Sequence, residues 1–92
     1  MRMLVALTVL TLLFAGCKPT PMPESGSLSE ELYVDKCGRC HTPYHPKVLT
    51  SAMWAEQVEA MQLKMPQMGV RPLNDAERVT ILNYLKRNAG GD

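Results

Sequence analysis

The stretch Cys37-Gly38-Arg39-Cys40-His41 decides how this chain folds, because it gathers thiols and an imidazole within five positions. The chain has 92 residues and is 46% hydrophobic, but much of that hydrophobic content lies in residues 1–16. Small domains bury a small share of their surface and often need a metal, a disulfide or a cofactor. The sequence therefore predicts one small domain with such help, and it argues against a multidomain enzyme.

Residues 1–16 have the pattern of an export signal. A positive start is followed by an apolar run from Leu4 to Phe14, which is too short to cross a membrane as a helix. Phe14-Ala15-Gly16-Cys17 resembles a bacterial lipobox, with Phe where Leu is usual. That resemblance implies cleavage before Cys17, lipidation of Cys17 and a periplasmic protein anchored by lipid to the inner or outer membrane. A plain signal peptide with an incidental Cys17 is the alternative.

The next segment has the composition of a linker. Residues 18–27 contain three prolines, two serines and a glycine, which cannot bury enough apolar surface to fold. We therefore predict a flexible tether over residues 17–27, including the lipidated cysteine, and a folded domain over 28–92. The charge of the chain says little about function, since its 10 Lys and Arg residues are nearly balanced by 9 Asp and Glu residues. The sequence contains no basic patch of the kind that binds nucleic acid.

The cysteine motif predicts covalent attachment of haem. Cys-x-x-Cys-His in an exported chain is the attachment signature of c-type haem. The thiols of Cys37 and Cys40 lie close enough to add to the two vinyl groups on one edge of the porphyrin. His41 then lies beneath the ring and can be the proximal iron ligand. The sequence has a single such motif, so we expect one haem.

Other chemistry is open to the same residues. Cys37 and Cys40 could form a disulfide, although two-residue spacing suits redox centres more than structural disulfides, and a thioredoxin-like site needs a βαβ context that is missing. Cys37, Cys40, His41 and His45 could bind zinc, which would make the protein a zinc-binding adaptor. His41 lies closer to Cys40 than the usual zinc-finger spacing allows.

Three motifs carry a resemblance to a known family. They are Cys37-x-x-Cys40-His41, Trp54-x-x-x-Val58-x-x-Met61 and Leu73-x-Asp75-x-Glu77-x-x-x-Ile81-x-x-Tyr84-Leu85. Residues 27–88 resemble small monohaem c-type cytochromes of the bacterial periplasm, including sulfite dehydrogenase cytochrome subunits and haem domains of quinohaemoprotein amine dehydrogenases. The resemblance implies a cytochrome c fold and redox protein partners, such as a dehydrogenase, an oxidase or another cytochrome.

Helix signals agree with an all-α fold in which three helices surround one covalently attached haem. Ser27 with Glu30 predicts a capped helix over about 28–41, stopped by Pro43 and Pro46. Ser51 predicts a second helix to about residue 64, broken by Pro66. The stripe on it comprises Trp54, Val58, Met61 and Met65. Asn74 with Glu77 predicts a third helix to about residue 88, carrying Val79, Ile81, Leu82 and Leu85, and ended by Gly90-Gly91. The first and last helices are expected to pack across each other.

The distal iron ligand is left open among several donors. His45 lies four residues after His41, so a continuing helix would put both on the same side of the ring. Met61 is favoured because it matches the resembling haem domains, and Met65 is the alternative because Met65-Pro66 is similar to the ligand pair of other c-type cytochromes. Met68 is a third candidate, although a methionine on an apolar stripe is often only a core residue.

Weaker hypotheses concern the surroundings of the haem. The carbonyl of Pro43 or Pro46 could accept a hydrogen bond from the ring of His41. Trp54 could stack on the haem or bind a propionate, or simply anchor the core. Lys64 or Arg71 could pair with a propionate, or remain solvated.

These residues predict an electron carrier. With both axial positions filled, the iron cycles between ferric and ferrous states with no site for a small-molecule substrate, so we expect no enzymatic activity. A haem-based binder or sensor of small ligands, with an open or labile sixth position, is the alternative from another functional class.

Overall fold

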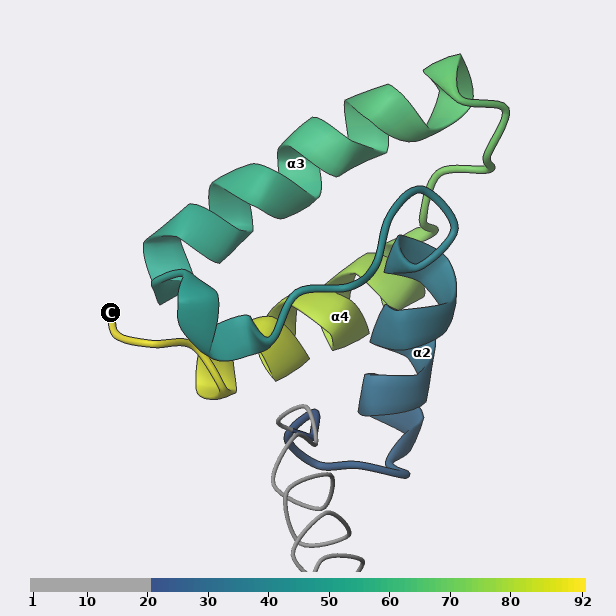
Figure 1. Cartoon of the computed structure of the whole chain (residues 1–92). Coiled ribbons are helices and arrows are strands. Elements are labelled where there is room, and N and C mark those ends of the chain that lie inside the picture. Colours follow the sequence, from purple (N-terminus) through teal and green to yellow (C-terminus); the bar gives the residue numbers. More distant parts are fainter. Residues whose placement is uncertain (1–20) are drawn as a thin grey trace, which may run out of the picture.

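The computed structural model describes residues 21–92, and it is built from helices (Figure 1). Three α-helices are present in this part of the chain, together with one short 3-10 helix, and no strand occurs in it. They are α2 (Leu28–Cys37), η1 (Pro46–Val48), α3 (Ser51–Gln67) and α4 (Asp75–Arg87). The predicted all-α class with three helices is therefore confirmed. None of the helices described is long and apolar enough to cross a membrane.

Side chains cap the N-terminus of each α-helix. The Ser27 hydroxyl accepts from the Glu30 amide at 3.1 Å, as the sequence predicts. Asn74 and Glu77 form the predicted reciprocal capping box, with bonds of 2.8 and 3.0 Å. The expected Ser51 cap is wrong, because Thr50 caps α3. Ser51 is the first helical residue, and its hydroxyl instead donates to the carbonyl of Lys86 at 3.2 Å.

Two predicted helix ends also differ from the structure. Helix α2 ends at Cys37 rather than near residue 41, because the Gly38 amide makes the last helical bond, to Val34. Helix α3 continues through Pro66 to Gln67. A proline in the last turn removes a single backbone donor, and the chain reverses only at Gly69, whose φ of 72° suits glycine.

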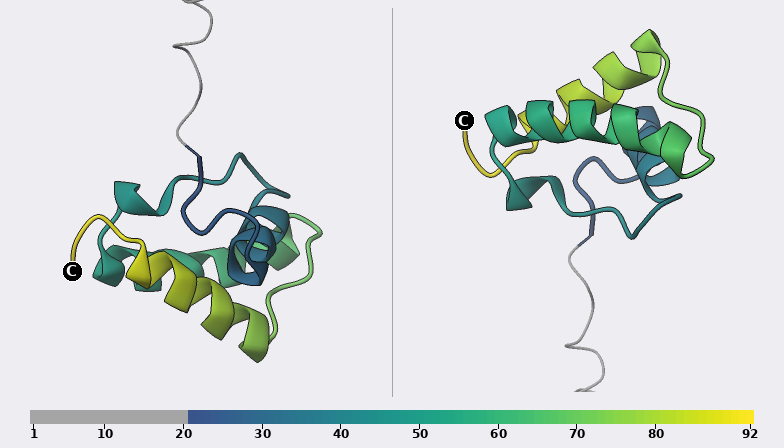
Figure 2. Two further views of the ribbon diagram at one scale, coloured as in Figure 1. Left: turned by 90° about the horizontal axis from the view of Figure 1, so that it is seen from below. Right: turned by 90° about the horizontal axis from the view of Figure 1, so that it is seen from above.

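The core lies between α4 and the other two helices. Helix α4 packs against both α2 and α3, and α2 crosses α4 as predicted (Figures 1 and 2). Ile81, Tyr84 and Leu85 are almost completely buried on the inner face of α4. Val79, which the sequence analysis grouped with them, is 52% exposed, because it projects about half a helical turn away from that face.

Both ends of the described chain contact the helical core. Near the C-terminus, the Gly90 amide donates to the Leu49 carbonyl at 2.9 Å, and the Ser51 amide donates to the Gly91 carbonyl at 2.9 Å. Gly90 and Gly91 therefore follow the end of α4, as predicted, and also bind the backbone at the start of α3.

Part of the predicted tether also contacts the core. Met22 packs against the core, the Tyr84 hydroxyl donates to the Pro23 carbonyl at 3.0 Å, and Glu24 binds Arg87. The earlier part of the tether, with Cys17, and the predicted signal over residues 1–16 lie outside the described residues.

Candidate functional site: an apolar pocket at the cysteine motif

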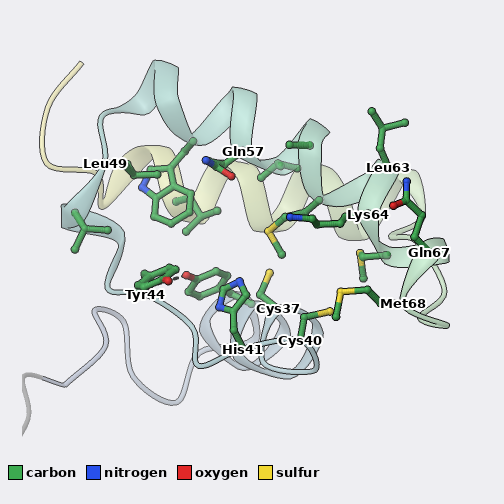
Figure 3. A pocket seen from close by; sticks show the side chains of 18 residues that line it. Cys37, Cys40, His41, Tyr44, Leu49, Gln57, Leu63, Lys64, Gln67 and Met68 are labelled. Carbon is green, nitrogen blue, oxygen red and sulfur yellow. Dashed lines mark hydrogen bonds between the residues drawn. The ribbon is translucent and has the colours of Figure 1, made fainter.

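A pocket of about 950 Å³ opens between α2, the loop that follows it and α3 (Figure 3). Cys37, Cys40 and His41 line one wall, and α3 forms the opposite wall. The structure therefore brings all three motif residues together in one cavity. The other lining residues are mainly apolar or aromatic: Tyr33, Tyr44, Val48, Leu49, Trp54, Val58, Ala60, Met61, Leu63, Met65, Met68 and Leu85, with Gln57, Lys64 and Gln67 as the remaining polar ones.

The two cysteines are free thiols on the pocket wall. Cys37 is the last residue of α2 and is buried, whereas Cys40 is half-buried in the turn that follows. Burial, followed by the neighbouring Cys40, raises the pKa of the Cys37 thiol to about 11. At neutral pH this thiol is protonated, and it forms part of the apolar wall.

The ring of His41 is oriented by the residue next to it. Its Nδ1 lies 2.9 Å from the carbonyl oxygen of Thr42. Because a carbonyl can only accept, this contact fits the neutral tautomer in which Nδ1 carries the proton and donates, and in that tautomer Nε2 has a lone pair for a metal. The predicted acceptors, the carbonyls of Pro43 and Pro46, are wrong. The adjacent peptide takes this role because α2 has already ended and the chain can turn sharply at His41.

Two buried aromatic residues hold the loop that carries His41. The Tyr33 hydroxyl, on α2, donates to the Tyr44 carbonyl at 2.6 Å. The Trp54 indole, on α3, donates to the buried carbonyl of Pro46 at 2.7 Å. The two rings meet edge to face, with centroids 6.3 Å apart. Among the roles that the sequence left open for Trp54, the structure supports that of a core anchor, because its N–H is used by the Pro46 carbonyl and not by a haem propionate.

Sequence reasoning missed the part played by Tyr33. It is 2% exposed, and burial raises the pKa of its hydroxyl, which keeps the donor protonated. The available signal was its position one helical turn before Cys37, which places both residues on the same face of α2. Its acceptor could not be read from the sequence, because Tyr44 lies beyond the end of the helix.

The three candidate methionines all line the pocket, and they differ in burial. Met65 is 2% exposed and belongs to the core, Met61 is half-buried, and Met68 is 55% exposed. His45 does not line the pocket, and its Nδ1 accepts from the Lys47 amide at 3.1 Å, which caps η1. Met61 and Met65 lie on α3, which forms the wall opposite His41, whereas Met68 follows the helix and lies beside Cys40 (Figure 3).

The zinc alternative needs several donor side chains gathered at one point. Within residues 21–92, no three or more His, Cys, Asp or Glu side chains are gathered so that they could hold a metal ion. The proposed set of Cys37, Cys40, His41 and His45 is thus not assembled in this part of the chain.

The pocket fits a covalently bound haem. Its volume lies near the upper end of the range for small-molecule sites, about 300–1,000 Å³, and such sites are mostly apolar with few polar groups. Cys37 and Cys40 offer two thiols on one wall, and His41 offers Nε2 beside them. These are the groups that c-type attachment and axial ligation require.

Comparison with known proteins agrees with this fit. A family model described as dihaem cytochrome c matches residues 33–92, which is well over half of the chain. No curated protein and no solved structure matches the chain. The match includes the cysteine motif, α3 and α4. It confirms the predicted resemblance to c-type cytochromes, whose cofactor is c-type haem and whose general activity is haem-based electron transfer. The chain belongs to the dihaem cytochrome c family.

Proposed function

We propose that this protein is a one-electron carrier of the bacterial periplasm, with one haem attached to Cys37 and Cys40 and ligated by His41. The proposal rests on one observation: Cys37, Cys40 and His41 lie together on one wall of an apolar pocket, and Nδ1 of His41, not Nε2, contacts the Thr42 carbonyl. When bound, the haem supplies an iron that alternates between ferric and ferrous states.

The chain's own residues then have three tasks. Cys37 and Cys40 hold one edge of the haem. Tyr33 and Trp54 hold the loop on which His41 lies, through their bonds to the Tyr44 and Pro46 carbonyls. The mainly apolar walls would surround the haem and keep part of the water away from it, which would limit rearrangement when the charge of the iron changes. None of these tasks needs an acid, a base or a nucleophile, so we propose a carrier and not an enzyme.

For the distal ligand we propose Met61, with Met65 as the alternative. Met61 lines the pocket and is only half-buried, so its thioether is less committed to the core than that of Met65, which is 2% exposed. A methionine opposite a histidine raises the reduction potential relative to two histidines.

We propose one haem for this sequence, although the family description names two. The sequence contains a single Cys-x-x-Cys-His motif, and each c-type haem uses one such motif. Mass spectrometry of the mature protein distinguishes the two counts, because each covalent haem adds its own mass. A mass gain equal to two haems would contradict this part of the proposal.

The remaining elements of the proposal concern location and partners. An export signal over residues 1–16 and lipidation of Cys17 would anchor the domain at a bacterial membrane, where it would exchange electrons with a dehydrogenase, an oxidase or another cytochrome. Cys17→Ser should release the protein from the membrane fraction while haem attachment continues. Retention of the Cys17→Ser protein in that fraction would argue against a lipid anchor.

The central experiment is spectroscopy of the exported protein. Haem staining on a denaturing gel should be positive for the wild type and negative for the double change Cys37→Ser and Cys40→Ser. The ferric wild type should be low-spin, with a methionine-to-iron charge-transfer band that Met61→Ala removes and Met65→Ala retains. The reverse pattern would transfer the assignment to Met65. A high-spin wild type that binds CO rapidly would instead indicate a ligand binder with an open sixth position.

A further inference from the structure

Lys64 is the charged side chain on the wall of the pocket. Among the lining residues in the described part of the chain, it is the one Lys, Arg, Asp or Glu. It lies on α3, and Figure 3 shows its side chain running along the pocket on the side opposite Cys37, Cys40 and His41. Lys64 is an exposed residue, so water can compensate the charge of its ammonium group, and an anion in the pocket can take the place of that water.

No acidic side chain within residues 21–92 forms an ion pair with Lys64, and the same holds for the exposed Lys47 and Lys86, neither of which lines the pocket. Arg71, the other candidate from the sequence, donates to both carboxylate oxygens of Glu77 at 3.0 and 3.2 Å and does not line the pocket. Lys36 lies 3.4 Å from the same carboxylate. The structure thus commits Arg71 elsewhere and leaves Lys64 available to an anion inside the pocket.

We propose that Lys64 pairs with a carboxylate of the bound haem and fixes how the haem lies in the pocket. The proposal rests on the pocket being the haem site. Thioether bonds to Cys37 and Cys40 hold the porphyrin at one wall, and a charge-assisted bond from Lys64 adds a second point of attachment on the opposite wall. Lys64 is therefore a positioning residue, and its charge also favours the ferrous state, because reduction makes the haem more negative.

The first test measures the midpoint reduction potential of the haem-loaded protein. Lys64→Gln should lower the potential relative to the wild type, whereas Lys64→Arg should keep it close to the wild-type value. The matched control is Lys86→Gln, because Lys86 is an exposed lysine on α4 that does not line the pocket. This control should leave the potential unchanged. Equal potentials for the wild type and Lys64→Gln, or equal shifts for Lys64→Gln and Lys86→Gln, would overturn the proposal.

The second test uses the unmodified protein, so it does not depend on whether a variant retains haem. In the reduced, diamagnetic state, proton NMR should show cross-peaks between the ε-methylene of Lys64 and the methylenes of a haem propionate. Their absence would overturn the pairing, while a wild type that carries no haem would refute the proposed function itself. The two failures are thereby distinguished.

Discussion

Replacing Tyr33 by Phe removes one hydroxyl and tests whether the core holds the haem-binding loop. The Tyr33 hydroxyl donates to the Tyr44 carbonyl over 2.6 Å, and Tyr33 is 2% exposed. Loss of such a bond costs about 0.5–1.5 kcal/mol, and up to about 3 kcal/mol when the remaining partner stays buried and unsatisfied. Because this hydrogen bond is only partly buried and Tyr44 is 60% exposed as a residue, the lower part of this range applies. We therefore expect a loss of about 1 kcal/mol, which lowers the Tm by about 4–8 °C in a domain of this size.

The assay combines guanidinium unfolding of the haem-loaded protein with hydrogen exchange. Tyr33→Phe should lower the midpoint at an unchanged m-value and should speed exchange of the Val48 amide, which donates to the His45 carbonyl at 3.1 Å just after Tyr44. Tyr84→Phe is the matched control, because the Tyr84 hydroxyl donates to the Pro23 carbonyl at 3.0 Å. It should speed exchange of the Ser27 amide, which donates to the Glu24 carbonyl at 3.0 Å, and leave the Val48 amide protected. Unchanged stability of Tyr33→Phe, or the same exchange pattern in both variants, would refute the idea that Tyr33 holds the loop.

Three further predictions concern contacts outside the pocket. Gln62→Ala should cost about 1–3 kcal/mol in unfolding experiments, since its amide accepts from the N–H and donates to the carbonyl of Leu73 at 2.8 and 2.9 Å. Gln62→Glu puts a carboxylate oxygen against the Leu73 carbonyl and should not restore the stability, so wild-type stability in either variant would contradict this account. Hydrogen bonds from Arg87 and Asn88 lower the pKa of the Glu24 carboxyl from 4.5 to about 2. The contact of residues 22–24 with the core should therefore be complete above about pH 4.5 and be lost as the pH falls through about 2. An NMR titration should show this pH dependence in the wild type, and Glu24→Gln should lack it. Gly90→Ala should lower the Tm, since a Cβ there would collide with the carbonyl of Lys47; an unchanged Tm would show that the two segments can separate without cost.

Local signals in the sequence were sufficient for most of the secondary structure. The Asn74–Glu77 capping box and the Ser27 cap are formed by residues three positions apart, so neighbouring sequence specifies them. Helix ends were less accurate. Helix α2 ends four residues early at Cys37, and α3 includes Pro66, because a helix end depends on which backbone groups find partners in the folded chain.

The candidate site also has a part that the sequence predicted and a part that depends on the fold. Cys37, Cys40 and His41 were predicted from spacing alone, since their chemistry needs only that two thiols and an imidazole lie close along the chain. The environment of His41 was not predicted correctly, because its hydrogen bond to Thr42 depends on the turn after α2. The sequence could not decide which methionine is the distal iron ligand, and the structure places all three candidates in the pocket lining.

The sequence by itself determined the haem motif, the helical class and the expectation that a short chain needs a cofactor, since all three depend on local spacing and composition. Only the tertiary structure decided what supports the site. In the folded protein Trp54 donates to the Pro46 carbonyl, Arg71 binds the Glu77 carboxylate, and Lys64 lines the pocket. The physical reason is that these pairings depend on how α2, α3 and α4 pack, and packing depends on contacts between residues that are far apart in the chain.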